Sequence, residues 1–359
     1  MRKRNFSWLM LIAIFGALAL VASACSDDDD DSGGGDTDTT TTAAANAGDD
    51  GAGDGTGTTT ADDGMSDTTT GAVGDLGAID LTDIDIAVGS KDFTEQLVLG
   101  EILVQTFEHF GANVDNRVDL GGTAVARAAL ESGDIDVYPE YNGTGWTVHL
   151  GQEDPSFDSD QLTKDVSEMD LAENSIRWVG QSPFNDTYGF ATGPDLTESN
   201  GGPFTLESMA TYLQDNPDAT VCLESEFPDR PDGLILFEDA TGFEIPQDQI
   251  EILDTGIIYN ETATGSCEFG EIFTTDGRIP ALDLTIVEDD GVFIIYNVSI
   301  TMRDELYQQD PEAFEAIATA LFAPLDEETM ADLNRRVSVD GEEASDVAAD
   351  FLTQIGITG

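Results

Sequence analysis

Hydrophobic and polar positions divide this chain into three stretches of different character. The first 25 residues hold an apolar run, and residues 26–80 contain almost no large apolar side chain. From Ile84 onward, the apolar positions alternate between the spacing of strands and that of helices. This third stretch of about 275 residues is too long for one small core and suits two lobes.

Strand and helix patterns alternate at the start of the third stretch. They predict strands at 84–88, 114–120 and 135–138, with helices at 93–110 and 123–130 between them. The first helix pattern stops at Gly111, a residue type typical of helix ends. This order predicts an α/β fold built from βαβ units with a parallel sheet.

A second series of patterns follows. It predicts a strand at 188–191, a helix at 206–213, a strand at 219–223 and a helix after Asp232, and it closes near 292–298. Helical patterns at 311–321, 327–337 and 343–355 then complete the chain. We expect the last of these to return to the first lobe.

The N-terminal 25 residues have the organisation of an export signal. A basic start, an apolar run at 8–21 and three small residues precede Cys25. The apolar run is shorter than the roughly 20 residues that span a bilayer, so we expect cleavage. A cysteine after small residues resembles the lipobox of bacterial lipoproteins, which predicts acylation of Cys25 and attachment to the outer face of the cytoplasmic membrane. Secretion with an unmodified thiol is the alternative.

Residues 26–80 consist mainly of Asp, Gly, Thr and Ala, which cannot bury enough surface to offset the entropy of ordering. We expect a flexible acidic linker. The whole chain has 73 acidic and 13 basic residues, a net charge of −60. Without a basic surface the phosphates of nucleic acid have no partner, so nucleic-acid binding is excluded. The acidic surface is best explained by solubility or adaptation to high salt.

Cysteine and histidine usage bears on disulfides, metals and catalysis. Cys222 and Cys267 belong to a chain predicted to be exported, which favours a disulfide over two separate buried thiols. The spacing of the three cysteines and two histidines predicts no metal site, and no cofactor is expected. No GxSxG motif or distinct carboxylate pair is present, so we expect no enzyme, and His109 and His149 are interpreted as structural.

Two cations stand out because bases are so scarce. Lys91 follows a predicted strand and precedes a helix, which is the edge of an α/β sheet where ligands bind. Arg230 lies in a proline-rich turn. Each can equally be a surface residue paired with a nearby acid.

Several spaced motifs resemble one family of proteins. They are GSKDFTEQ at 89–96, LGGT at 120–123, LESGDIDVYPEYNGT at 130–144, NDTY at 185–188, RPDG at 230–233 and FTTDGRI at 273–279. In this order they resemble the glycine betaine/choline-binding proteins of osmoprotectant ABC importers. The resemblance extends over nearly everything after residue 83.

The resemblance implies a two-lobed periplasmic-binding-protein fold of type II, with two crossover strands and the ligand in the cleft between lobes. Lobe I would comprise residues 83–188 and 297–359, and lobe II residues 189–296. An aromatic cage would hold the cation of the ligand, and Asp186 would place negative charge near it. Lys91, Thr144 and Arg230 would bind the ligand carboxylate. The cage residues would be Tyr141, Tyr188, Phe273 and Tyr296.

A quaternary ammonium group has no N–H to donate, so ring faces and diffuse negative charge must hold it. Glycine betaine or proline betaine is the expected ligand. Choline or carnitine is the alternative within the same fold, and a ligand-sensing lipoprotein without a transporter is a different class of function. The expected partners are an ABC permease and ATPase subunits on other chains, with this chain acting as a monomer.

Overall fold

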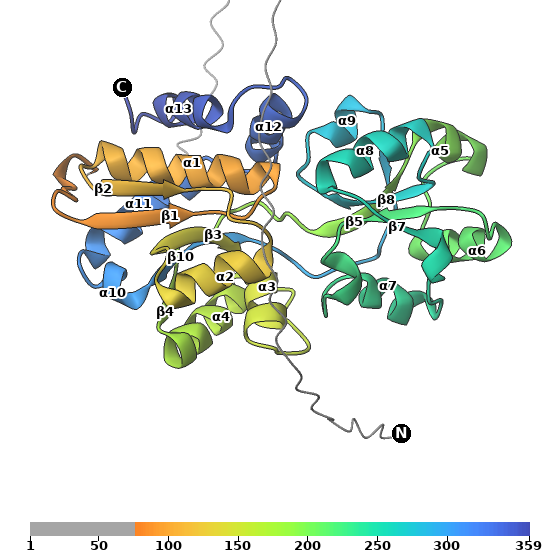
Figure 1. Cartoon of the computed structure of the whole chain (residues 1–359), viewed down its shortest axis with the longest axis horizontal. Helices are drawn as coiled ribbons and strands as arrows, with labels where there is room; N and C mark the ends of the chain where they lie inside the picture. Colours follow the sequence, from red (N-terminus) through yellow and green to blue (C-terminus); the bar gives the residue numbers. More distant parts are fainter. Residues whose placement is uncertain (1–75) are drawn as a thin grey trace, which may run out of the picture. The chain divides into compact units, whose positions relative to one another are not determined.

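The computed structural model describes residues 76–359, which contain two separate five-stranded sheets (Figure 1). Within these residues, none of the helices is both long and apolar enough to cross a membrane. We call the sheet with the earliest strands, together with its helices, the first lobe, and the other sheet with its helices the second lobe. Cys25 lies outside the described residues.

The first lobe contains a sheet in the order β2-β1-β3-β10-β4. Its strands are β1 (Asp85–Gly89), β2 (Asn113–Arg117), β3 (Val137–Tyr141), β4 (Ile176–Val179) and β10 (Val298–Arg303). Strand β1 is parallel to both of its neighbours, whereas β10 is antiparallel to β3 and β4. The last strand therefore enters this sheet from the opposite direction.

The second lobe contains a sheet in the order β7-β6-β8-β5-β9. Its strands are β5 (Tyr188–Thr192), β6 (Val221–Leu223), β7 (Ile250–Ile252), β8 (Phe269–Phe273) and β9 (Thr285–Ile286). Strand β6 is parallel to its neighbours, and β5 is antiparallel to β8 and β9. Tyr188 therefore belongs to the second sheet, whereas the predicted boundary made it the last residue of the first segment of lobe I.

Helices surround both sheets (Figure 1). Those of the first lobe are α1 (Thr94–His109), α2 (Thr123–Ser132), α3 (Asn142–Thr144), α4 (Ser159–Asn174), α10 (Asp304–Tyr307), α11 (Pro311–Phe322), α12 (Glu327–Ser338) and α13 (Ala344–Gln354). Those of the second lobe are α5 (Pro194–Asn200), α6 (Leu206–Asp215), α7 (Leu234–Thr241), α8 (Thr255–Thr264) and α9 (Arg278–Ala281). A π-helical turn, Gly145–His149, continues α3.

Local capping explains where several helices begin. Asp158, Asp310 and Asp326 accept hydrogen bonds from the backbone N–H three residues later, at the starts of α4, α11 and α12. Thr205 and Ser208 form a reciprocal capping box at the start of α6. Such contacts satisfy N–H groups that have no partner within the helix.

Alternation along the strands gives each lobe two buried faces. In β3, Val137 lies on the face covered by α1, whereas Tyr138 packs with α2 and α4 on the other. In the second sheet, Val221 faces α6 and α7, and its neighbour Cys222 faces α8. This period of two is the expected geometry of a strand buried on both sides.

The structure corrects three predictions about these elements. The sheets are mixed and not parallel, because the chain leaves the first lobe and returns to it through β10. The predicted strand at 114–120 ends at Arg117, and it is a largely exposed edge strand. The linker predicted to reach residue 80 ends earlier, because Leu76–Ala78 form a 3-10 helix and Leu76 packs against the core.

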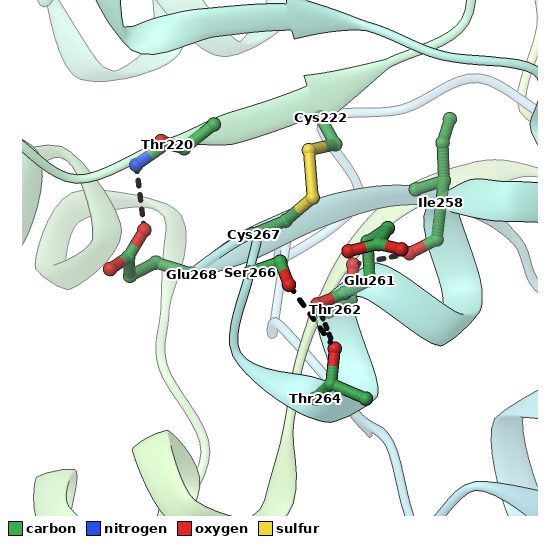
Figure 2. The surroundings of a disulfide bond; sticks show 9 residues. All are labelled: Thr220, Cys222, Ile258, Glu261, Thr262, Thr264, Ser266, Cys267 and Glu268. Carbon is green, nitrogen blue, oxygen red and sulfur yellow. Dashed lines mark hydrogen bonds between the residues drawn. A yellow bond between two sulfur atoms is a disulfide. The ribbon is translucent and has the colours of Figure 1, made fainter.

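The expected disulfide joins Cys222 in β6 to Cys267, just before β8 (Figure 2). The two Cα atoms are 5.8 Å apart, and 45 residues of sequence separate them. Both side chains are buried against Ile258 of α8. The bond therefore fastens two neighbouring strands of the second sheet on the face that α8 covers.

Candidate ligand-binding site

A cavity of about 640 Å³ has walls from both lobes. Seven of the eight predicted ligand-binding residues line it: Lys91, Tyr141, Thr144, Asp186, Tyr188, Phe273 and Tyr296. The eighth, Arg230, lies behind the wall and donates hydrogen bonds to Thr123 and Thr144, which do line the cavity. The structure therefore brings together residues that are far apart in the sequence.

Strand ends place these side chains. Lys91 follows β1, Tyr141 ends β3 and Phe273 ends β8, so all three come from the carboxyl ends of strands. Tyr188 begins β5 and is directly opposite Phe273 in the antiparallel pairing of β5 with β8. Tyr296 lies in the segment that returns the chain to the first lobe, just before β10. Carboxyl ends of strands are the usual location of ligand sites in α/β proteins.

Five aromatic rings form a closed circuit in the cavity wall, which we call the aromatic circuit. Successive ring centroids are 6.2 Å apart from Tyr141 to Phe93, 5.0 Å from Phe93 to Phe273 and 5.2 Å from Phe273 to Tyr188. The circuit closes through Tyr296, 5.4 Å from Tyr188 and 6.4 Å from Tyr141. Rings this close together can contact one cation at the same time, because cation–π contacts extend to roughly 6 Å from a ring centroid.

Sequence reasoning missed Phe93. It is the residue immediately before α1 and stacks on both Tyr141 and Phe273, so without it the circuit would be open. Its position between Lys91 and the start of a helix was the available signal, because an aromatic residue at a strand-to-helix junction faces the sheet edge where ligands bind.

The hydroxyl groups of two of these tyrosines have partners in the protein. Tyr141 donates to Oε1 of Glu95 at 2.9 Å, and Tyr296 donates to Oδ2 of Asp232 at 2.9 Å. Burial raises the pKa of both phenols well above the usual value, so they stay neutral. Such bonds fix the orientation of a ring within the cavity wall.

Lys91 is neutralised by a buried carboxylate. Its Nζ atom lies 2.7 Å from Oε1 of Glu140, and both side chains are almost fully buried. Glu140 is also 2.8 Å from Nε2 of His149 and accepts a hydrogen bond from Tyr138. Burial opposes ionisation of Glu140, but Lys91 and His149 outweigh it and hold the pKa of this carboxyl group well below its usual value.

Arg230 is fully engaged inside the protein. Its Nε and Nη2 atoms donate to the two carboxylate oxygens of Asp232, each at 2.8 Å. It also contacts the first lobe, where Thr123 and Thr144 accept hydrogen bonds at 3.1 and 3.2 Å, and its guanidinium lies 5.4 Å from the centroid of the Tyr188 ring. Asp232 in turn accepts a hydrogen bond from Thr147 in the π-helical turn. This pair joins the two lobes.

Two buried carboxyl groups lie next to each other beside the aromatic circuit. The hydroxyl of Thr275 is 2.6 Å from Oε2 of Glu95 and 2.7 Å from Oδ1 of Asp186. This hydroxyl has one proton to donate, so the second contact needs a proton on a carboxyl group. Burial, reinforced by the charge of Glu95, raises the pKa of Asp186 well above its usual value. This shift favours the protonated form of Asp186 in the empty cavity.

The remaining charged residues of the cavity wall are mainly acidic, and none of them was assigned to the site from the sequence, although Asp92 and Arg278 lie within its motifs. Asp92, Glu224, Glu226 and Asp254 line the cavity, as does Arg278. Arg278 is paired with Asp276 through two hydrogen bonds. Among residues 76–359, no group of three His, Cys, Asp or Glu side chains is arranged to hold a metal ion.

Known proteins share both the sequence and the fold. Residues 84–354 match the family described as the substrate binding domain of the ABC-type glycine betaine transport system. The glycine betaine-binding protein YehZ of Escherichia coli is 34% identical over 280 residues, covering 76% of this chain and 91% of that protein. The glycine-betaine-binding protein of Pseudomonas aeruginosa is 31% identical over 276 residues, covering 75% of this chain and 87% of that protein.

A solved structure supports the same assignment. Apo YehZ from Escherichia coli has a TM-score of 0.56 and 33% identity, and the match covers 76% of this chain and 99% of that one. This likeness confirms the expected two-lobed periplasmic-binding-protein fold. By sequence and by fold, the chain belongs to the family of substrate-binding domains of ABC-type glycine betaine transport systems.

Proposed function

We propose that the cavity captures one small quaternary ammonium solute, such as glycine betaine or choline, and that the closed protein delivers it to an ABC permease. The aromatic circuit is the observation that carries the proposal, because five neighbouring aromatic rings line one cavity, where a cation can lie close to several of them at once. The curated relatives named above are glycine betaine-binding proteins.

The rings can supply the binding energy. A desolvated cation–π contact contributes up to about 2 kcal/mol, so five rings would reach roughly 10 kcal/mol at most. Micromolar binding needs about 8 kcal/mol, and the ordering of ligand and lobes takes up part of the total. The aromatic circuit can therefore supply most of the binding free energy, and a contact at the other end of the ligand would supply the rest.

Ligand binding and lobe closure are coupled in this proposal. Tyr141 and Phe93 come from the first lobe, Tyr188 and Phe273 from the second, and Tyr296 from the segment between them. A cation at the centre is surrounded completely only when the lobes are together, so it favours the closed form. The permease and its ATPase subunits, on other chains, would recognise that form.

Proteins of this family work outside the cytoplasm, and an acylated Cys25 would keep this one at the membrane. Each buried CH₂ of an acyl chain contributes about 0.8 kcal/mol, so two or more chains suffice for stable attachment. The acidic stretch after Cys25 would act as the tether. The chain would function as a monomer and release its ligand chemically unchanged.

Calorimetry with the purified protein tests the ligand class. Tetramethylammonium should bind with one molecule per chain, and NMR should find it unchanged after incubation. Tyr188→Ala should weaken binding at least tenfold, because it opens the circuit at a ring that contacts two others. Tyr307→Ala, which removes a ring stacked on Arg177 away from the cavity, is the control and should bind as the unmodified protein does. Binding of a standard amino acid but of no quaternary ammonium compound would refute the proposal.

A further inference from the structure

The cavity offers little to a ligand carboxylate. Lys91, one of the two cations expected to bind it, is 2.7 Å from Glu140 and lies over the ring of Tyr141. The other, Arg230, uses two of its nitrogen atoms on Asp232. Both positive charges are therefore compensated by carboxylates of the protein before any ligand enters.

One nitrogen of Arg230 is not committed to Asp232, and an acidic side chain already faces it. Nη1 donates to Thr123 at 3.1 Å and lies 3.6 Å from Oε2 of Glu226. Thr123 and Glu226 both line the cavity. The position beside Nη1 and Thr123, where a ligand carboxylate would find its cation, is occupied by the carboxylate of Glu226.

Glu226 reaches this position across the two lobes. It follows β6 in the second lobe, yet its carboxylate packs against Gly122 of the first lobe so closely that a Cβ atom on Gly122 would clash with it. The absence of a side chain at Gly122 leaves room for this approach. The contact exists only when the lobes are together, which is also the form that encloses a ligand.

The charge of the cavity wall acts in the same direction. Asp92, Glu224 and Asp254 line the cavity with Glu226, whereas Lys91 and Arg278, the cationic side chains of the wall, are each paired with a buried carboxylate. A ligand with a net positive charge is attracted by this wall, and a ligand carboxylate is repelled by it.

We infer that Glu226 is a specificity-determining residue that occupies the carboxylate position of the site and makes the protein prefer net-cationic quaternary ammonium ligands of the choline type over zwitterions of the betaine type. The inference rests on the proposed function. It concerns the ranking of two ligands that share the quaternary ammonium group and differ in whether a hydroxyl or a carboxylate follows it.

Calorimetry with choline and glycine betaine on the full chain tests it. The unmodified protein should bind choline more tightly than glycine betaine. In Glu226→Gln, the Kd for glycine betaine should fall about tenfold or more, because the like charge disappears and Nη1 of Arg230 becomes available, while the Kd for choline should change less than about threefold. Glu226→Ala should act in the same direction.

Asp254→Asn is the matched control, because it removes the same charge from the same wall, and among the described residues Asp254 forms no ion pair with Arg230. It should change the ratio of the two Kd values in the same direction as Glu226→Gln but by much less, because it removes the charge without freeing Nη1 of Arg230. An unchanged ratio of the two Kd values in Glu226→Gln, or the same change of ratio in Asp254→Asn, would overturn the inference and leave the proposed function intact. If the unmodified protein bound neither ligand, the proposed function would fail and the inference with it.

Discussion

Two regions of the site differ in their side chains and in whether the protein itself already compensates those side chains. The rings of the aromatic circuit line the cavity, and the hydroxyls of Tyr141 and Tyr296 are hydrogen-bonded to carboxylates of the protein. In contrast, Lys91 is paired with Glu140 and Arg230 with Asp232, so these charges are compensated inside the protein. The comparison shows that apolar rings can line an empty cavity at no electrostatic cost, whereas a buried charge needs a counter-ion in the protein before a ligand arrives.

The largest expected effect concerns the ion pairs. Asp232→Asn leaves Arg230 buried without its counter-ion, and breaking a buried pair in this way costs about 3–5 kcal/mol. Urea unfolding should show this loss in the free energy of unfolding. Asp229→Asn, an exposed acid in the same turn, should change it by less than about 0.5 kcal/mol. A small effect of Asp232→Asn would mean that Arg230 is free to serve a ligand, and the two regions would then differ less than the structure indicates.

The next effect concerns pH, at the pair Glu95 and Asp186. A bound cation stabilises the carboxylate form of Asp186, whose pKa is raised in the empty cavity. Binding should therefore release a proton, and the affinity for tetramethylammonium should rise with pH, by up to about tenfold per unit, between the pKa values of the bound and free forms. Calorimetry in buffers of different ionisation enthalpy measures the proton directly.

The stability of the empty protein should respond to pH in the opposite direction. Because the folded pKa of Asp186 lies above the unfolded one, the unfolded state loses its proton first as pH rises from about 4. The contribution of this group to the free energy of unfolding is thus lost as pH rises through the folded pKa. Asp186→Asn should abolish both the proton release and this loss. Proton release that persists in Asp186→Asn would assign it to another group.

The smallest expected effect concerns Phe93. Phe93→Leu keeps an apolar side chain but removes one ring face from the circuit, so the affinity for tetramethylammonium should fall by about three- to tenfold with the fold intact. Phe93→Tyr should restore it, because the ring face returns. Phe157→Leu, at an exposed phenylalanine, should have no effect on binding. Equal binding by Phe93→Leu would show that four rings are enough.

Much of the fold could be predicted because local patterns determine it. The helices expected at 206–213 and 311–321 are confirmed as α6 and α11, whose starts are capped by Thr205 and Asp310. The edge position of β2 and the antiparallel direction of β10 could not be predicted from the sequence. Both depend on contacts with distant segments of the chain. The same limit applies to the site, where motifs located seven of the residues that line the cavity. They could not show that Lys91 and Arg230 form buried ion pairs with Glu140 and Asp232.

The bond between Cys222 and Cys267 has a topological consequence for the mouth of the cavity. Residues Ile252–Ile257, which line it, lie within the covalent ring that this bond closes. One wall of the cavity is thus part of a closed loop of chain and has no free end that could peel away. A protease that cut this wall once would leave a single covalently linked molecule, which would separate into two fragments only after reduction.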